Sequence, residues 1–346
     1  MSPVDRRHKI LIASHLEREL VERIAGVDER LDVLWAPELL PVPRYAADHI
    51  GQPRSLSDTD LHRWRSLLAE ADISFDFDWW QPASMPQNAP RLQWVQATSS
   101  GIGEMVRSNG LADTDLTLTT AAGVHCDPLG EFVLFGLLWL AKDIPQLLDW
   151  QRQHRWQRHT SRQLAGQRVL IIGAGSVGRR VAELCAAAHM EVWVAVRPGR
   201  NRDIPGVRRC ISVDEVTGVL SEVDALVLAC PLTDDTFHLI GPKQLAALPA
   251  HAVLVNVARG QVVDEVALVE ALSAGRLAGA ALDVFEQEPL PTSSPLWDMP
   301  NVFVSPHSAS TVADENVRIV DLFVDNLRLF LDGQPLRNEY SRARDY

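Results

Sequence analysis

The sequence predicts an α/β protein with two domains, each built on a doubly wound parallel sheet. The length of 346 residues favours two domains, because a single core rarely grows beyond about 250–300 residues. Short apolar runs alternate with segments of helical periodicity along most of the chain, as expected when helices connect neighbouring parallel strands. A glycine-rich turn joins one apolar run to one helical segment near the middle of the chain. These three features define the fold class.

The first part of the chain has its own strand–helix alternation but lacks a phosphate-binding loop. A proline-rich linker follows its second strand and interrupts the alternation. We expect strands at residues 9–13, 31–35, 73–77, 91–98 and 116–120, and helices at 16–24 and 60–69.

A second series of strands follows a long helix expected at residues 130–153. Helices between most of these strands predict one parallel sheet. An amphipathic helix at 314–332 comes after this sheet is complete, so we expect it to return to the first domain. The domains are therefore predicted at 1–119 with 310–346, and at 120–309. The strands of the second domain are expected at 169–172, 191–196, 225–229, 253–257, 279–285 and 302–305.

A GxGxxG turn after the strand 169–172 carries the strongest functional signal. Its position between a strand and a helix is the context of a dinucleotide-binding fingerprint. The first glycine permits the tight turn, the second lets backbone approach a pyrophosphate, and the third lets the helix pack closely on the strand. The helix N-terminus adds N–H groups and a positive dipole end. The second domain is therefore predicted to be a Rossmann domain that binds the cofactor through Gly173, Gly175, Ser176, Val177 and Gly178.

The strand 191–196 ends at Arg197, where an acidic residue would bind the ribose hydroxyls of NAD. No Asp or Glu stands there, and Arg200 and Arg202 follow closely. A guanidinium fork suits the 2′-phosphate of NADP. We therefore expect Arg197 and Arg200 to bind that phosphate, with NADP(H) preferred and NAD(H) still possible. The alternative is a solvated basic turn without a ligand.

Composition and sequence pattern limit which partners and which cellular compartment are expected. The formal net charge is −12, so neither nucleic acid nor an anionic membrane surface is expected as a partner. The N-terminus lacks a signal-peptide pattern, and the longest apolar stretch, 132–141, is too short for a bilayer. We expect a cytoplasmic protein. No metal is expected, because the cysteines do not have the spacing of a metal site such as C-x-x-C. We expect all four to be small buried side chains: Cys126, Cys185, Cys210 and Cys230.

Three polar residues follow three strands of the second domain: Arg259, Glu288 and His307. The carboxyl ends of parallel strands share one edge, where open α/β sheets bind ligands. Histidine suits proton donation to a carbonyl that accepts a hydride. A carboxylate would hold the imidazolium, and an arginine would clamp a substrate carboxylate and polarise the carbonyl. Taken singly, each side chain is better explained by an ordinary role: His307 as a hydrogen-bonded loop residue, Arg259 as a helix-capping charge and Glu288 as part of a solvated turn. The functional interpretation depends on the three together.

Five segments resemble, in order and spacing, signatures of the D-isomer-specific 2-hydroxyacid dehydrogenases. The resemblance spans roughly from Ala97 to the final helix. It implies that His307 is the general acid/base, that Glu288 is its partner, and that Arg259 binds the carboxylate and keto oxygen of a 2-oxo acid. The segments that carry it are Gly173–Gly178, Pro231–Thr233, Asn256–Gly260, Leu282–Leu290 and Ser305–His307.

The resemblance also assigns residues to cofactor and substrate. Asp283 would contact the nicotinamide carboxamide, and Ala258 would approach the nicotinamide ribose. The residues that would line the cofactor channel are Cys230, Pro231 and Thr233. The loop 99–103 resembles the one whose backbone N–H groups grip the substrate carboxylate, although a plain strand-to-helix turn explains its glycines equally. Its expected substrate-binding residues are Ser100, Gly101 and Ile102.

The architecture implied by the resemblance is a flavodoxin-like substrate domain, a Rossmann cofactor domain, and an active cleft between them that closes over substrate. The helix expected at 130–153 resembles the one through which these proteins form homodimers. An internal core position fits its large apolar residues equally well: Phe132, Phe135, Leu138 and Trp139.

Two features depart from the family pattern. Arg197 replaces the acidic residue common in NAD-dependent members. The pair Trp79–Trp80 stands where a less distinctive segment is expected. Trp79 is therefore a candidate wall of the substrate pocket and hints at a bulky or apolar 2-oxo acid, although ordinary core packing explains it as well.

The expected activity is reduction of a 2-oxo acid to a D-2-hydroxy acid with NADP(H), in the manner of glyoxylate/hydroxypyruvate reductases. Formate-oxidising relatives have glutamine where this chain has Glu288, and a phosphite-oxidising relative stays open on motifs alone. A dinucleotide-sensing, non-enzymatic protein of the same fold would also keep the three polar residues. Against it, this chain has only short termini and no long disordered extension for recruiting partners.

Overall fold

The computed structural model describes residues 7–52, 55–199 and 203–342. Contacts divide the chain into unit 1, Met1–His125 with Thr311–Tyr346, and unit 2, Cys126–Ser310. The chain thus crosses between units after 125 and after 310, where the sequence placed the crossings after 119 and 309. The first crossing comes later because the His125 side chain is still held in unit 1, by hydrogen bonds with Ser100 and Glu315.

Unit 1 is built on a five-stranded parallel sheet in the order β2-β1-β3-β4-β5, the flavodoxin-like order. The strands are β1 (His8–Ile12), β2 (Leu31–Leu34), β3 (Ile73–Phe75), β4 (Trp94–Gln96) and β5 (Thr117–Thr119). The helices are α1 (Arg18–Ala25), α2 (Asp58–Glu70), α3 (Met85–Asn88), α4 (Gly103–Ser108) and α11 (Glu315–Leu331), with short 3-10 turns η2 (Pro37–Leu39), η3 (Pro82–Ser84) and η4 (Leu111–Asp113).

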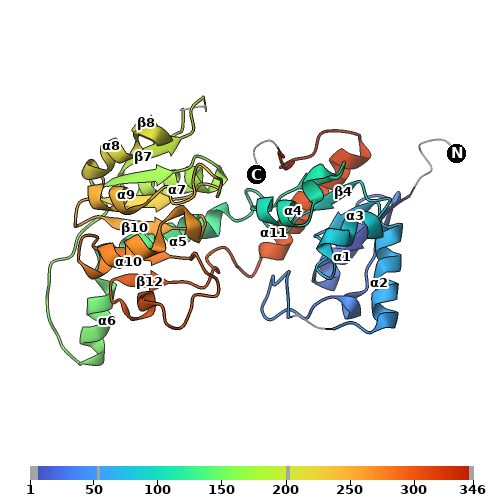
Figure 1. Cartoon of the computed structure of the whole chain (residues 1–346), viewed down its shortest axis with the longest axis horizontal. Coiled ribbons are helices and arrows are strands. Elements are labelled where there is room, and N and C mark those ends of the chain that lie inside the picture. Colours follow the sequence, from blue (N-terminus) through green and yellow to red (C-terminus); the bar gives the residue numbers. More distant parts are fainter. Residues whose placement is uncertain (1–6, 53–54, 200–202, 343–346) are drawn as a thin grey trace. The chain divides into compact units, whose positions relative to one another are not determined.

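Alternation along β1 divides the core of unit 1 between two faces. Leu11 packs with residues of α2, α3 and α4, whereas Ile10 and Ile12 pack with α1 and α11. Successive strand residues point to opposite faces, so each face is covered by its own helices. The final helix α11, drawn in red in Figure 1, therefore completes the core of unit 1.

Unit 2 is built on a seven-stranded parallel sheet in the order β12-β11-β10-β9-β6-β7-β8, the Rossmann arrangement with one further strand. The strands are β6 (Arg168–Ile172), β7 (Glu191–Val196), β8 (Arg209–Ser212), β9 (Ala225–Leu228), β10 (Val253–Asn256), β11 (Gly279–Leu282) and β12 (Val302–Val304). The helices are α5 (Cys126–Ala141), α6 (Ile144–Arg152), α7 (Ser176–Ala187), α8 (Val216–Val219), α9 (Pro242–Ala247) and α10 (Glu265–Ser273), with 3-10 turns η5 (Val213–Glu215), η6 (Leu220–Glu222), η7 (Gly260–Val262) and η8 (Pro295–Asp298).

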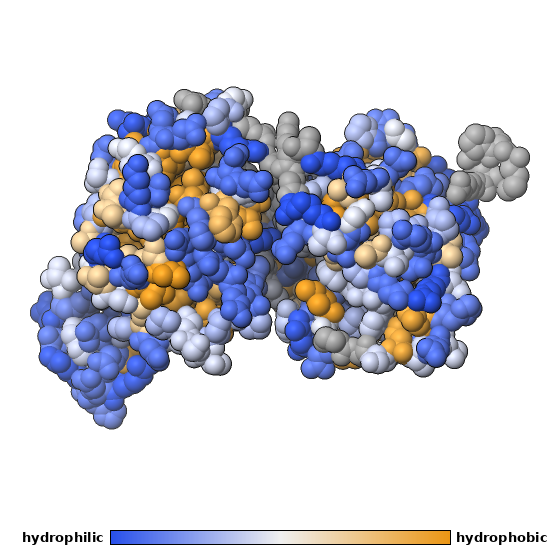
Figure 2. Space-filling view, viewed as in Figure 1, coloured by the Kyte–Doolittle hydropathy of each residue, from blue (hydrophilic) through white to orange (hydrophobic). Residues whose placement is uncertain are grey.

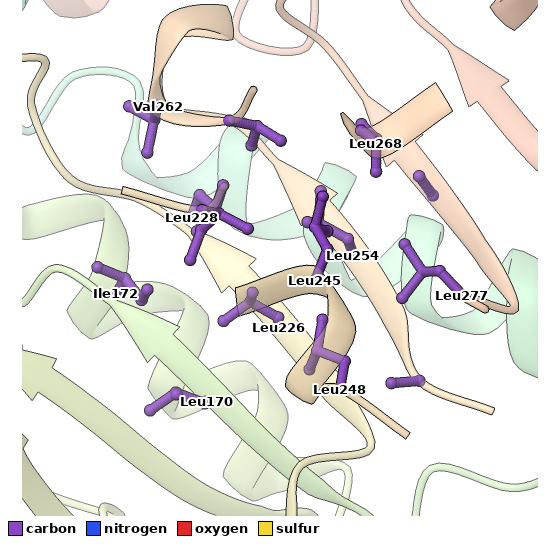
Figure 3. Close-up of a cluster of buried hydrophobic side chains, with 14 of the residues drawn as sticks. Leu170, Ile172, Leu226, Leu228, Leu245, Leu248, Leu254, Val262, Leu268 and Leu277 are labelled. Atoms are coloured by element: carbon purple, nitrogen blue, oxygen red, sulfur yellow. The ribbon is translucent and has the colours of Figure 1, made fainter. Parts of the chain in front are cut away.

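The six strands expected from the sequence are present, and the expectation of only six was wrong. The edge strand β8 was missed because Ile211 is its only buried residue, so its apolar signal is weak. One face of the sheet carries leucines and an isoleucine from β6, β9 and β10 that pack against α9 and α10, as Figure 3 shows. The other face packs against α5 and α7.

The single helix expected at 130–153 was also wrong. The structure has α5 and α6, separated at Asp143, which takes a left-handed φ of 51°. Pro145 lies in the first turn of α6, where the backbone N–H that it lacks would have no partner within the helix. Inside one long helix it would remove a backbone hydrogen bond and break the helix. Among the described residues, no helix combines the length and apolar character needed to cross a bilayer.

The cysteines divide into two pairs. Cys185 and Cys230 are buried, and burial raises the pKa of each thiol to about 12. Cys126 and Cys210 are only half-buried, so the expectation of small buried side chains fails for these two. Cys210 is less covered because it belongs to the edge strand β8.

Candidate active site

The loop after β10 positions Arg259 through a clamp formed by Asn256. The Asn256 side chain accepts a hydrogen bond from the Ala258 N–H at 3.0 Å and donates to the Arg259 carbonyl at 3.0 Å. The guanidinium donates to the Ala258 carbonyl at 2.7 Å. Arg259 is half-buried, so its charge lies at the carboxyl edge of the sheet in a defined backbone frame.

Gly260 lets this loop contact the loop that carries Glu288. A Cβ on Gly260 would lie 1.8 Å from the Phe285 carbonyl carbon and 2.0 Å from its oxygen. No side chain other than hydrogen fits this approach, so the Arg259 loop and the segment after β11 are in direct contact. Arg259 is also close enough to Glu288 for its charge to lower the pKa of that carboxyl.

His307 and Glu288 form a hydrogen-bonded pair. The distance from His307 Nδ1 to Glu288 Oε2 is 2.7 Å, and Glu288 Oε1 accepts from the Phe285 N–H at 3.0 Å. Burial acts to raise the pKa of Glu288, but these hydrogen bonds and the charges of His307 and Arg259 outweigh it, and the pKa is lowered. The ionised carboxylate therefore accepts from Nδ1–H, which leaves Nε2 as the nitrogen that exchanges a proton.

Asp283 anchors the loop that presents His307. Its Oδ1 accepts from Ser305 Oγ at 2.6 Å and from the N–H groups of Ser308 and Ala309 at 2.9 and 3.0 Å. The Asp283 carbonyl accepts from the His307 N–H at 2.9 Å. Burial raises the pKa of Asp283, while these donors oppose the shift. The anchor holds His307 at a left-handed φ of 54°, a strained conformation that the surroundings must impose.

The glycine turn between β6 and α7 has the shape that a pyrophosphate needs. A Cβ on Gly173, whose φ is 109°, would lie 2.4 Å from the Ala229 carbonyl oxygen, and a Cβ on Gly178 would lie 2.0 Å from the Gly173 oxygen. Gly175 is different, because it is exposed and nothing lies within 4 Å of its Cβ position. It stands at the N-cap of α7, where no side chain caps the helix. This open backbone cradle fits a dinucleotide phosphate, through the N–H groups of Ser176 and Val177.

These contacts predict opposite effects of alanine at Gly175 and at Gly178. Gly178→Ala forces a Cβ into the Gly173 carbonyl, so we expect a loss of about 1–3 kcal/mol in the free energy of unfolding. Gly175→Ala meets no protein atom, so stability is kept while dinucleotide affinity falls. Thermal unfolding and dinucleotide titration of both variants separate the two effects. Equal unfolding temperatures for the pair would contradict the assignment.

The turn after β9 lies beside the glycine turn, since the Gly173 Cβ position is also 2.9 Å from the Cys230 nitrogen. The hydroxyl of Thr236 holds this turn: it donates to the Pro231 carbonyl at 2.7 Å and accepts from the Thr233 N–H at 2.7 Å. Pro231 is exposed and Thr233 half-buried. Arg197 is exposed immediately after β7, whereas Arg200 lies outside the described residues.

The residues expected to bind substrate in unit 1 follow β4 and β3. Ser100 and Gly101 are exposed at the start of α4, and Ile102, its N-cap residue, is buried. The Trp79 indole donates to Asp76 Oδ2 at 2.9 Å, and the ring is half-buried. A structural contact thus accounts for its indole N–H.

Sequence reasoning missed four residues that shape these sites: Thr236, Asn256, Gly260 and Ser305. Each of them holds or shapes the loop that carries a neighbouring candidate residue. Their positions close to the family-like segments could have indicated this role, because a polar residue or a glycine beside a strand end often stabilises the turn. Within the described ranges, no group of three or more His, Cys, Asp or Glu side chains has a metal-holding arrangement.

Comparison with known proteins gives consistent matches. Residues 134–309 match the family described as D-isomer specific 2-hydroxyacid dehydrogenase, NAD binding domain. A glyoxylate/hydroxypyruvate reductase B from Yersinia enterocolitica is 31% identical over 313 residues, which cover 87% of this chain and 86% of that protein.

Solved structures match the whole length. A D-isomer specific 2-hydroxyacid dehydrogenase from Xanthobacter autotrophicus, in complex with NADPH and MES, has a TM-score of 0.79 and 30% identity, and the match covers 98% of this chain and 100% of that chain. An NADPH-dependent glyoxylate/hydroxypyruvate reductase from Sinorhizobium meliloti, in complex with NADP and sulfate, has a TM-score of 0.78 and 25% identity, with the same coverage of 98% and 100%.

Proposed function

The chain belongs to the D-isomer specific 2-hydroxyacid dehydrogenase family, and from this premise we propose that it reduces a 2-oxo acid to the D-2-hydroxy acid with NADP(H). One observation carries the proposal. The His307–Glu288 pair, at 2.7 Å, stands beside the Arg259 loop at the carboxyl edge of the sheet that also bears the glycine turn. Relatives named for glyoxylate and hydroxypyruvate reduction support this substrate class.

In this proposal His307 supplies the proton that the reduction needs. A bound reduced nicotinamide would supply the hydride for the carbonyl carbon. His307 Nε2–H donates its proton to the carbonyl oxygen. Before transfer, the imidazolium is stabilised by the Glu288 carboxylate, whose lowered pKa keeps it ionised. After transfer, the neutral ring keeps Nδ1–H on Glu288, so the same tautomer is ready for the next proton.

Arg259 binds the substrate carboxylate and stabilises the oxygen on which negative charge develops. A guanidinium can donate two parallel hydrogen bonds to a carboxylate, and a preorganised donor stabilises the transition state because it needs no reorientation. The Asn256 clamp and the Gly260 contact supply that preorganisation.

In this proposal the glycine cradle and the adjoining turns would hold the cofactor. Ala258 would lie beside the nicotinamide ribose, and Cys230, Pro231 and Thr233 would line the channel. Asp283 Oδ1 is engaged by its own loop, so a contact with the carboxamide falls to Oδ2. In unit 1, the N–H groups of Gly101 and Ile102 bind the substrate carboxylate, Ser100 lies beside it, and Trp79 borders the pocket.

An initial-rate assay tests the proposed reaction. NADPH and NADH are supplied in parallel against 2-oxo acids from glyoxylate to phenylpyruvate, and loss of reduced-nicotinamide absorbance is followed. We expect turnover with NADPH preferred. Cofactor binding without turnover of any 2-oxo acid would overturn the proposal.

Arg197→Asp is expected to reverse the cofactor preference. The change removes a charge-assisted hydrogen bond to the 2′-phosphate, worth about 1.5–3 kcal/mol or roughly ten- to a hundredfold in affinity, and provides an acceptor for the ribose hydroxyls of NADH. The ratio of kcat/KM for NADPH to that for NADH measures the effect. An unchanged ratio would show that the loop does not read the phosphate.

We further propose a cytoplasmic homodimer. α5 presents Phe135, 46% exposed, and Leu138, 39% exposed, while Leu147 and Leu148 on α6 are 37% and 42% exposed. Phe132, Phe135 and Trp139 also contact the Phe303 ring, so part of this surface serves the core. The α6 region, drawn at the lower left of Figure 1, is largely hydrophilic on the face seen in Figure 2, so the proposed contact is limited to these apolar residues.

Leu138→Arg is expected to convert the dimer to a monomer, because it buries an unpaired charge in the proposed contact. Light scattering coupled to size-exclusion chromatography measures the mass. Val266→Arg is the control, since Val266 is 69% exposed on α10 and away from α5 and α6. A Leu138→Arg protein that keeps the wild-type mass would refute the assignment, and cell fractionation tests the compartment.

A further inference from the structure

Hydrogen bonds of Glu286 tie together the loops that follow β9, β10 and β11 in unit 2. The distance from Glu286 Oε1 to His238 Nε2 is 2.7 Å, and the same oxygen accepts from the Glu265 N–H at 3.1 Å. The Glu286 N–H donates to Glu265 Oε2 at 3.0 Å. The Glu286 carbonyl accepts from Gln261 Nε2 at 3.0 Å. Glu286 is therefore held to both neighbouring loops through its side chain and its backbone.

Glu286 lies inside the turn from Phe285 to Glu288, which presents the carboxylate that contacts His307. Within this turn Glu288 Oε1 accepts from the Phe285 N–H at 3.0 Å, and Glu288 Oε2 lies 2.7 Å from His307 Nδ1. A carboxylate moves with the backbone that carries it. The place of Glu288 beside the imidazole therefore depends on the contacts that hold Glu286.

The His238 imidazole has further contacts that fix it in place. Its ring stacks on the Phe237 ring with the centroids 4.1 Å apart, and the His238 N–H donates to the Gln261 carbonyl at 2.8 Å. Its φ of 48° is left-handed, a conformation that is uncommon for a residue with a side chain and that the surroundings must impose. The imidazole is thus a defined partner for Glu286.

The contact between His238 and Glu286 does not depend on the charge of the imidazole. Nε2 donates to a carboxylate oxygen in the neutral Nε2–H tautomer and in the imidazolium alike. A single oxygen, Oε1, receives both side-chain contacts of Glu286. An amide oxygen in the same place could accept from both donors, so glutamine would keep the contacts and remove only the negative charge.

We propose that Glu286 is a positioning residue for the reduction, because it fixes the turn that aligns Glu288 with His307. The inference rests on the proposed function, in which Glu288 holds the imidazole that donates the proton. Glu286 acts through Glu288, and His238 acts through Glu286. Loss of the contact would therefore slow the proton transfer and leave the Arg259 guanidinium and the glycine cradle in place.

Glu286→Ala is expected to lower kcat by about ten- to a hundredfold, because a displacement of about 1 Å at a reacting group can cost about a hundredfold. The KM for the 2-oxo acid and the Kd for NADPH should stay at their wild-type values. Glu286→Gln should recover the wild-type kcat. His238→Ala should lower kcat by a smaller factor, because the Glu265 N–H still holds the oxygen. Steady-state kinetics with the best 2-oxo acid, NADPH titration and thermal unfolding measure these effects.

His251→Ala is the matched control. His251 Nε2 lies 2.8 Å from Asp224 Oδ1, and the other oxygen of this carboxylate accepts from the Arg168 N–H at 2.7 Å. The contact has the same chemistry as that of His238, but it lies where β6 and β9 begin, at the opposite edge of the sheet from His307. Its loss should leave kcat unchanged.

Glu288→Ala separates positioning from a general structural role. In that background the further change Glu286→Ala should cost no more than about twofold in kcat, because the carboxylate to be aligned is already gone. Losses that multiply in the double variant overturn the positioning role. So does a wild-type kcat for Glu286→Ala, or a Glu286→Gln protein as slow as Glu286→Ala.

Two further outcomes are decided in advance. If Glu286→Ala does not fold, His238→Ala alone and combined with Glu288→Ala gives the same test, and multiplying losses again overturn the role. Wild type that binds NADPH but reduces no 2-oxo acid overturns the proposed function and this inference with it. That failure is distinguishable from the others, because in those the wild type is active.

Discussion

His307→Ala is expected to lower kcat by about 10²–10⁴-fold, the usual contribution of a positioned general acid, while the Kd for NADPH stays unchanged. The His307 imidazole is the proposed proton donor, and its Nδ1 is already engaged by Glu288 at 2.7 Å, which leaves Nε2 for the substrate. Removing the ring removes the proton donor without touching the glycine cradle. Single-turnover reduction and NADPH titration measure the two quantities.

Two further variants are measured beside His307→Ala. Glu288→Gln tests the role of the carboxylate, and His251→Gln is the control. Glu288→Gln keeps a hydrogen bond to Nδ1 but removes the negative charge that stabilises the imidazolium, so turnover should fall while the Kd for NADPH stays unchanged. His251 pairs with Asp224 at 2.8 Å on the exposed surface, and its change should leave turnover intact. Turnover of His307→Ala at the wild-type rate would end the assignment of the acid.

Arg259→Ala is expected to reduce kcat/KM for the 2-oxo acid by about 10²–10³-fold, the range seen when a donor to a developing oxyanion is removed. Arg259→Lys should recover only part of the loss, because an ammonium keeps the charge but not the two parallel donors of a guanidinium. Steady-state kinetics of both variants, with glyoxylate and hydroxypyruvate, measure the effect.

Arg23→Ala is a matched control for the loss of an arginine, since Arg23 is paired with Asp321 on the surface of unit 1. Its kinetics should equal those of wild type. If Arg259→Lys were as active as wild type, the bidentate role would be wrong and a simple charge would suffice. If both Arg259 variants bound NADPH poorly, the residue would belong to the cofactor site.

Features that depend on residues close together in the sequence could be predicted from the sequence. The glycine turn was recognisable because a strand, three spaced glycines and a helix follow one another directly, and each glycine answers a local demand. Arg259, Glu288 and His307 could be expected on one edge because parallel strands end together. Boundaries were less accurate. The helix expected at 130–153 was predicted from its periodicity alone, without regard to the break that Pro145 marks.

Features that join distant residues could not be predicted in this way. No pattern in the sequence relates Gly260 to the Phe285 carbonyl or Ser305 to Asp283, and the hydrogen bonds from Ser100 through His125 reach Glu315 across 190 positions between the last two. β8 was missed because an edge strand buries little apolar surface.

The sequence by itself determined the two sheets, the dinucleotide turn and the identity of the three polar residues at the strand ends. The tertiary structure decided the tautomer of His307, the frame that holds Arg259 and the contacts that join Ser100 to His125 and Glu315. The physical reason is the range of the interactions. Strand, turn and helix preferences act over a few residues, whereas a hydrogen bond that orients an imidazole or a hydroxyl exists only after folding brings its two partners together.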